Sequence, residues 1–141
     1  MSAYFDTSSF VKLFLPEPGS AQVRSLWVAA SPCVSSVALV AEALAALGRA
    51  RWTSRLSHRN HVAMVRQALD RWAEMEPLEL TEPLARRAGE LAEVYALRGY
   101  DAIHLASAEA ILDEGDVMIV SDTRLAEAAA SIGIAALVPA T

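Results

Sequence analysis

The fold is decided by the stretch Tyr4-Phe5-Asp6-Thr7-Ser8-Ser9-Phe10-Val11-Lys12, near the start of the chain. Its first residues, Tyr4 and Phe5, predict a short apolar strand that stops at Asp6. The apolar residues from Phe10 to Phe14 then recur at helical spacing until a break that contains Pro16. A strand that passes directly into a helix is the repeating unit of parallel α/β sheets. The beginning of the chain therefore favours an α/β fold.

The same alternation of strand and helix continues to the end of the chain. Further strands are predicted at Cys33–Ser36, Pro77–Leu80, Val117–Val120 and Ala135–Val138. Helices are predicted after Ser20 as an N-cap, at Val37–Arg51, at Ser57–Met75, at Pro83–Leu97 with a stop at Gly99, at Asp101–Leu112 and at Thr123–Ile132. The sequence contains no internal repeat or linker. It therefore predicts one domain over residues 1–141, a three-layer α/β sandwich whose short, mostly parallel sheet is flanked by helices.

Composition limits the class of partner and the compartment. Of the 141 residues 54% are hydrophobic, which suits a sizeable core and excludes a disordered chain. The net charge of −5 argues against capture of nucleic acid by the overall field, but all cations except Lys12 are arginines, which suit local phosphate contacts. The lone Cys33 is expected in the core. The longest uncharged run, Ser25–Ala41, is too short to span a bilayer, and no signal peptide precedes Asp6, so we expect a cytoplasmic protein without a membrane segment.

Four acidic residues are poorly explained as ordinary surface groups. Glu42 is the only charged side chain in residues 25–48, and burying a lone carboxylate is costly unless it is paired or binds a metal. Asp6 and Asp122 each follow a predicted strand, at the edge where α/β sheets place ligands. Asp101 lies in the first turn of an apolar helix. Taken singly, each aspartate is also a plausible helix N-cap, and Glu42 is also plausible as an exposed residue of an alanine-rich helix.

Considered together, these acids suggest a metal site. Hard cations such as Mg²⁺ and Mn²⁺ prefer oxygen ligands, and a carboxylate cluster suits metal-assisted hydrolysis of a phosphodiester bond. Phosphoaspartate enzymes also place an Asp after their first strand. A haloacid-dehalogenase-like phosphatase would need a second Asp where Ser8 stands, and a receiver-like domain would need a late lysine that this chain lacks.

Four segments in order span nearly the whole chain: Tyr4–Lys12, Ser36–Leu44, Tyr100–Ala108 and Ile119–Ala126. In this order and spacing they resemble the PIN-domain nucleases, and among them the VapC-like toxins of bacterial and archaeal toxin–antitoxin pairs. The third segment, Tyr100-Asp101-Ala102-Ile103-His104-Leu105-Ala106-Ser107-Ala108, is the most specific of them.

The resemblance implies one metal site that is built from the carboxylates of Asp6, Glu42, Asp101 and Asp122. It implies that this site binds Mg²⁺ or Mn²⁺ and cleaves RNA, with Asp6 and Asp101 as the inner ligands. Glu42 would act directly, through water, or as a base. Many relatives carry Ser or Thr two residues before the last acid, where this chain has Val120, so Ser121 is the candidate substitute. A cognate antitoxin and a homodimer are further implied, and the alternative function is a PIN-like module that regulates or binds RNA without catalysis.

Other side chains have a structural and a functional interpretation. His104 lies one helical turn after Asp101, but a packing histidine is favoured over an acid–histidine catalytic pair. His58 and His61 indicate a solvated helix end rather than a metal site. Thr7 and Ser8 suit either a helix start or contacts to phosphate and metal-bound water.

Two larger groups of residues also have both a structural and a functional interpretation. A solvated or partner-binding face is favoured over an RNA-contacting edge for Arg49, Arg51, Arg55 and Arg59. Core packing is favoured over an antitoxin groove for Phe10, Phe14, Leu26 and Trp27.

Overall fold

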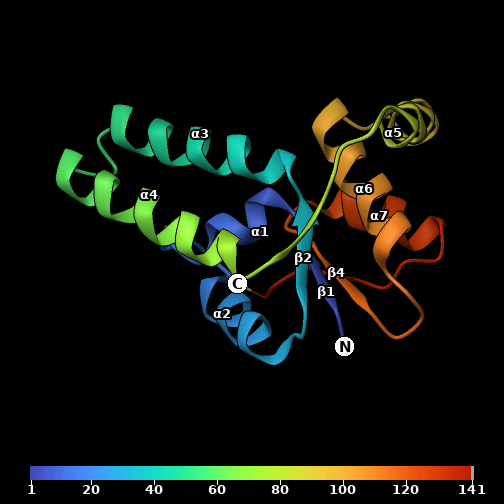
Figure 1. Cartoon of the computed structure of the whole chain (residues 1–141), viewed down its shortest axis with the longest axis horizontal. Helices are drawn as coiled ribbons and strands as arrows, with labels where there is room; N and C mark the ends of the chain where they lie inside the picture. The colour runs from blue at the N-terminus through green and yellow to red at the C-terminus, as the bar shows by residue number, and fades with distance from the viewer. Residues whose placement is uncertain (141) are drawn as a thin grey trace.

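The computed structural model describes residues 1–140, and a five-stranded parallel sheet lies at its centre. The strands are β1 (Ala3–Phe5), β2 (Cys33–Ser36), β3 (Glu76–Leu78), β4 (Val117–Ile119) and β5 (Ala136–Leu137). Their order is β3-β2-β1-β4-β5, so the chain runs outward from β1 in one direction and then in the other (Figure 1). β1 and β4 pair in parallel, with Phe5 beside Ile119. The residues that follow these two strands therefore emerge next to each other, at the switch point where α/β sheets bind ligands.

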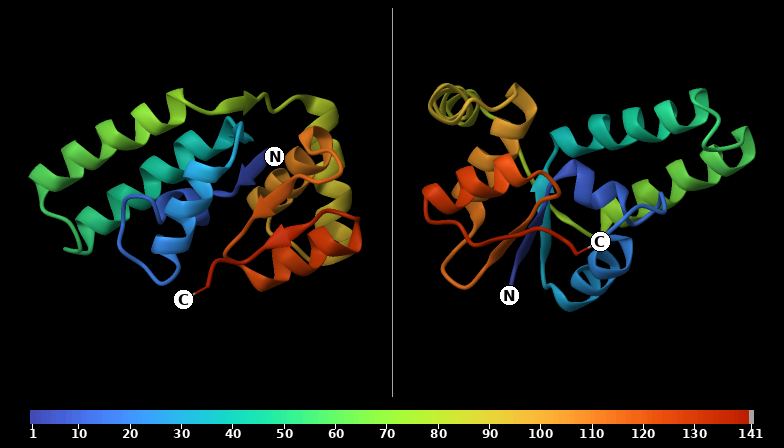
Figure 2. Two further views of the ribbon diagram at one scale, coloured as in Figure 1. Left: turned by 90° about the horizontal axis from the view of Figure 1, so that it is seen from below. Right: turned by 180° about the vertical axis from the view of Figure 1, so that it is seen from behind.

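Helices cover both faces of the sheet. They are α1 (Thr7–Val11), α2 (Ser20–Ala29), α3 (Ala38–Trp52), α4 (His58–Ala73), α5 (Glu82–Tyr95), α6 (Gly99–Ile111) and α7 (Thr123–Ser131). The first four lie on one side and the last three on the other, and α3 and α4 form a long hairpin that extends away from the sheet (Figures 1 and 2). The predicted three-layer α/β sandwich is confirmed. Within residues 1–140, no helix combines the length and apolar character that a bilayer crossing requires.

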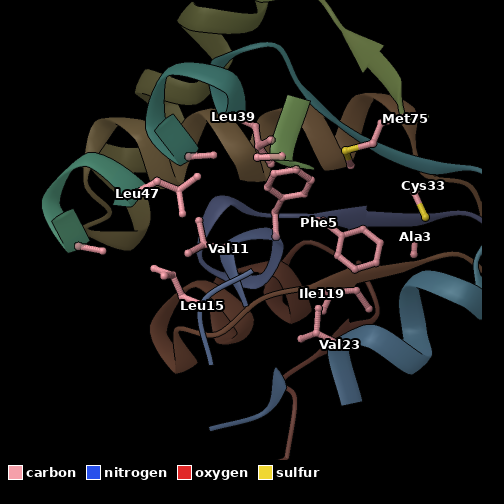
Figure 3. Packing of buried hydrophobic residues seen from close by; sticks show 14 residues of the cluster. Ala3, Phe5, Val11, Leu15, Val23, Cys33, Leu39, Leu47, Met75 and Ile119 are labelled. Atoms are coloured by element: carbon pink, nitrogen blue, oxygen red, sulfur yellow. The ribbon is translucent and has the colours of Figure 1, made fainter. Parts of the chain in front are cut away.

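Alternation along β1 divides the core into two clusters. Phe5 points to the α1–α4 side, where it is fully buried with Leu39 and Leu47 (Figure 3), and Tyr4 points to the α5–α7 side, where it is equally buried. Cys33 belongs to the first cluster, and burial raises the pKa of its thiol to about 11. It is thus an unreactive core residue, as the sequence predicted.

The early aromatic residues pack in the core. Phe10 is buried, and its ring centroid lies 5.2 Å from that of Phe14 and 6.1 Å from that of Trp27. Phe14, Leu26 and Trp27 are partly buried against the same cluster. The core interpretation of these four residues is therefore the one that the structure supports.

Two predicted helix ends were wrong. Gly19, not Ser20, occupies the N-cap of α2, and the Ser20 hydroxyl instead accepts from the Glu17 amide and donates to the Leu15 carbonyl. Gly99 does not stop α5. That helix ends at Tyr95, and its C-cap, Ala96, adopts the left-handed conformation that usually favours glycine. Gly99 is the first residue of α6.

Two other predicted elements were displaced. The first helix spans Thr7–Val11 and ends before Phe14, because turns follow it directly. β3 begins at Glu76 and ends at Leu78, two residues before the predicted end. Its Pro77 is tolerated because β3 is an edge strand, where a missing amide hydrogen breaks no ladder.

Candidate active site

A cleft of about 830 Å³ opens where β1 and β4 end. Its lining comes from the starts of α1 and α6, from one side of α3 and from the loop after β4. All four predicted acids line it: Asp6, Glu42, Asp101 and Asp122. The parallel pairing of β1 with β4 brings Asp6 and Asp122 to this edge, and the Asp6 amide donates to the Ile119 carbonyl at 3.2 Å.

Asp6 is both a helix cap and a buried carboxylate. Its Oδ1 accepts from the Ser9 amide at 2.8 Å, which caps α1, and the Ser8 hydroxyl donates to both carboxylate oxygens at 3.0 and 3.1 Å. Burial raises the pKa of Asp6 in spite of these hydrogen bonds. No cationic side chain within residues 1–140 forms an ion pair with it. The cap therefore leaves the Asp6 carboxyl group at the cleft without an ion-pair partner.

Glu42 is paired rather than freely exposed. It lies near the start of α3 with a side chain that is 23% exposed, and its Oε1 is 2.8 Å from His104 Nε2. His104 is buried, with Nδ1 2.7 Å from the Tyr4 hydroxyl and Nε2 3.0 Å from the Thr7 hydroxyl. The favoured packing role of His104 is thus supported, but its acidic partner is Glu42 and not the neighbouring Asp101.

Asp101 and Asp122 are held in different ways. Asp101 does not cap α6, since the N-cap is Arg98, and its Oδ2 accepts from Arg98 Nε at 3.0 Å. Asp122 caps α7, with Oδ1 accepting from the Arg124 amide at 2.9 Å. Next to it, the Ser121 hydroxyl lies 3.3 Å from that of Ser9 and lines the cleft. The Ser121 hydroxyl therefore lies at the cleft, whereas Val120, which occupies the position of the Ser or Thr in many relatives, is buried.

Only part of the predicted basic edge reaches the cleft. Arg49 and Arg55 line it, and Arg55 also lies 3.9 Å from Glu17. Arg51 stacks on the Trp52 ring, 4.9 Å from its centroid, and Arg59 is exposed outside the cleft. His58 is likewise exposed, and within residues 1–140 the two helix-start histidines belong to no metal-binding group.

The cleft carries the donors that a hard divalent cation requires, although no coordination sphere is preformed. Four carboxylates face one space, and Glu42 Oε2, Asp101 Oδ1 and Asp122 Oδ2 accept no hydrogen bond from residues 1–140. Within the same residues no three His, Cys, Asp or Glu side chains are close enough to hold a metal ion as they stand. The donor chemistry fits Mg²⁺ or Mn²⁺, which keep several waters and need few protein ligands.

Residues 3–131 match the PIN domain family. The chain belongs to the PIN-domain family. A similar PIN protein is Ribonuclease VapC49 of Mycobacterium tuberculosis (strain ATCC 25618 / H37Rv), which is 42% identical over 130 residues, or 92% of this chain and 90% of VapC49.

Solved structures show the same PIN fold. The toxin-antitoxin complex from Klebsiella pneumoniae contains a chain that superposes with a TM-score of 0.70 at 19% identity, over 97% of both chains. A chain of FitAcB from Neisseria gonorrhoeae superposes with a TM-score of 0.72 at 18% identity, again over 97% of both chains. At these identities the likeness concerns the fold alone.

The network behind Glu42 was missed at the level of sequence. Tyr4 was predicted only as a strand residue, and Thr7 only as a helix start or phosphate contact. One signal in the sequence could have found it. Side chains alternate along β1, so Tyr4 and Phe5 point to opposite faces of the sheet, and α6 with His104 covers the face of Tyr4.

Proposed function

We propose that this PIN domain is a Mg²⁺- or Mn²⁺-dependent endoribonuclease and the toxin of a toxin–antitoxin pair. The observation that carries the proposal is the convergence of four carboxylates, from four segments of the chain, on one cleft at the switch point of the sheet. The relative that is 42% identical over nearly its whole length is named a ribonuclease, which supports RNA as the substrate.

Each acid has a proposed part in the reaction. Asp6 and Asp101 would be the inner ligands of the cation, with Asp122 completing the site. Glu42, held through Oε1, keeps Oε2 to orient water or to contact the cation. When bound, Mg²⁺ or Mn²⁺ supplies activation of water and neutralisation of charge on the scissile phosphate.

The arginines of the cleft have a role in binding RNA. Because the net charge is −5, long-range electrostatics oppose an RNA chain, and local cations must offset this repulsion. Arg49 and Arg55 line the cleft beside the acids, and arginine suits phosphate contacts. We assign them to backbone phosphates next to the cleaved bond.

Metal-dependent cleavage of RNA tests the proposal. The purified protein is incubated with mixed-sequence RNA in Mg²⁺, in Mn²⁺ and in excess chelator, next to Asp6→Asn, Asp101→Asn and Asp113→Asn. Asp113 is an exposed acid outside the cleft, so its variant is the matched control. We expect cleavage by the wild type and the control only when metal is present, and none by the two site variants. Full activity in chelator, or in both site variants, would contradict the mechanism.

A specific observation favours a second candidate, an RNA-binding PIN module without catalysis. Within residues 1–140 the acids form no ready coordination group, and Arg98 already holds Asp101. A module of this kind binds RNA in a gel-shift experiment at the metal concentrations where the nuclease would cut it. Retention of intact RNA in Mn²⁺ would therefore favour the module.

Partners follow from the same proposal. The structural neighbours include a toxin-antitoxin complex, and large apolar side chains remain exposed on several elements, among them Val28, Trp52 and Val94. We propose a cognate antitoxin and a homodimer, and a single domain over residues 1–141 acting in the cytoplasm, where RNA is found. Light scattering and co-expression with the protein of the neighbouring reading frame test these partners. A strict monomer that recovers no inhibitory protein would reject the toxin assignment and leave the nuclease to be judged separately.

A further inference from the structure

We propose that His104 is a positioning residue: its imidazole, oriented by the Tyr4 hydroxyl, donates from Nε2 to Glu42 and fixes the Glu42 carboxylate in the cleft. The catalytic consequence of this inference rests on the nuclease function proposed above.

Four elements meet at the His104 ring, since the Thr7 hydroxyl of α1 lies 3.0 Å from Nε2 in addition to the contacts that follow. His104 projects from α6 and is 1% exposed, Tyr4 from β1 approaches Nδ1 at 2.7 Å, and Glu42 from α3 approaches Nε2 at 2.8 Å. α3 and α6 belong to opposite helix layers of the sandwich (Figure 1). The hydrogen bond from His104 to Glu42 therefore joins the two layers across the end of the sheet, at the cleft.

The partners of the ring decide where its proton lies. The Ser36 amide donates to the Tyr4 oxygen at 3.2 Å, so this oxygen accepts there. The Tyr4 hydroxyl has a single proton, and with the Ser36 amide on its oxygen it donates that proton to Nδ1, 2.7 Å away. With Nδ1 as the acceptor, the Nε2 atom of His104 carries a ring proton. This is the arrangement that a carboxylate at Nε2 requires, since a carboxylate oxygen accepts.

Glu42 depends on this bond for its position. Within residues 1–140, His104 is the only side chain that hydrogen-bonds the Glu42 carboxylate, which is long, flexible and partly exposed. A group that acts on water or on a cation must be held close to its productive geometry. Second partners of this kind, which orient a ligand without touching the substrate, strongly affect metal sites.

Two substitutions separate positioning from packing. A Gln side chain carries an N–H near the place of Nε2, whereas an Asn side chain reaches only the place of Nδ1. His104→Gln can keep the bond to Glu42, and His104→Asn keeps only the contact to Tyr4. At saturating Mn²⁺ we expect His104→Asn to lower kcat about 10- to 100-fold with a smaller change in KM for RNA, and His104→Gln to recover most of that loss.

A purely structural role would give a different result. It predicts that both variants lower the melting temperature while kcat per folded molecule stays at the wild-type value. Equal kcat in wild type and His104→Asn, at a temperature where circular dichroism shows both folded, overturns the inference. Equal losses in His104→Asn and His104→Gln overturn it as well, because the recovery depends on the donor at Nε2.

Measurements without RNA separate this inference from the nuclease proposal. Long-range ¹⁵N–¹H spectra of the metal-free wild type should show the Nε2–H tautomer of His104, and Tyr4→Phe should no longer hold a single tautomer. An Nδ1–H tautomer in the wild type overturns the inference whether or not RNA is cleaved. If the tautomer is as expected but the wild type cleaves no RNA, the nuclease proposal fails, and the affinity for Mn²⁺ then tests the positioning role. In that case His104→Asn must bind Mn²⁺ about tenfold more weakly than His104→Gln. Equal affinities of the two variants overturn the inference.

Discussion

At the scale of the residue, Asp6 combines a structural and a chemical role that substitutions can separate. Asn keeps an acceptor at Oδ1 for the Ser9 amide and removes the charge, whereas Ala removes both. We expect Asp6→Asn to lower RNA cleavage about 100-fold or more while the metal-free protein is at least as stable as the wild type. Asp6→Ala should lose the activity and also about 1 kcal/mol of stability with the cap of α1. Cleavage rates and urea unfolding in chelator measure both effects, and equal stability of the two variants would show that the cap contributes little.

The burial of Asp6 also predicts a dependence of stability on pH. Its pKa is raised in the folded chain, so the folded state binds the proton more tightly than the unfolded state does. The stability of the metal-free protein should therefore fall as the pH rises from the usual Asp value of 3.8 through the folded pKa. Asp6→Asn lacks this contribution, so its advantage in melting temperature over the wild type should grow with pH. A difference that stays constant with pH in chelator would mean that Asp6 has the same pKa in both states.

The contacts of His104 could not be predicted from the sequence. The four acids stand out because Glu42 and Asp101 lie on otherwise apolar helices and Asp6 and Asp122 each follow a predicted strand. His104 has no such distinguishing feature in the sequence, and its spacing of three residues from Asp101 suggests the wrong hydrogen-bond partner. Asp101 bonds to Arg98 instead, and the partner of His104, Glu42, is 62 residues away in the chain. A pair formed through the fold cannot be inferred from local spacing.

At the scale of the element, α5 carries a glycine in its interior and an alanine where a glycine would be favourable. Gly89 is exposed inside the helix, and a Cβ added there meets nothing within 4 Å. Ala96 closes the helix at a φ of 54°, in the left-handed region. We expect Gly89→Ala and Ala96→Gly each to raise stability by about 0.5–1 kcal/mol, the first through helix propensity and the second through relief of the strained cap.

Chemical unfolding of the two variants and of their combination checks this prediction. Because Gly89 and Ala96 are separated by about 10 Å along the helix, at about 1.5 Å per residue, their effects should add. A loss of stability in Ala96→Gly would mean that the left-handed cap is not formed in solution. A loss in Gly89→Ala would mean that a neighbouring chain or element covers that face of α5.

Ala96 also explains why element boundaries were harder to predict than elements. Apolar runs and, at Pro77–Leu80, an alternating pattern located all five strands, and Cys33–Ser36 was placed to the residue. Helix ends depend on single backbone conformations, and residue type only biases these. Gly99 has the residue type of a stop but lies in α6, while Ala96 takes the left-handed conformation because the chain must turn there between two packed helices.

At the scale of the whole molecule, strand order determines whether the four acids can share one cleft. The sequence predicted an alternating, mostly parallel sheet but not which strands are neighbours, since order is set by long-range pairing. The pairing of β1 with β4 joins Asp6 to Asp122, and the connections through α3 and α6 add Glu42 and Asp101. At the level of sequence this convergence came only from the resemblance to PIN domains.

Because the acids converge only in the folded chain, a cation that binds them must stabilise the whole molecule. Mn²⁺ at a free concentration about 100-fold above its Kd would add about 2.7 kcal/mol. For a domain of this size that corresponds to a rise in melting temperature of about 5–10 °C. Thermal unfolding in a series of Mn²⁺ concentrations should show this rise in the wild type and in the exposed control Asp113→Asn. Asp6→Asn and Asp101→Asn should lose most of it, because each removes a negative charge from the shared cleft. If all four proteins gain equally, Mn²⁺ binds elsewhere on the folded chain, and the convergence of the carboxylates has a purpose other than holding a metal.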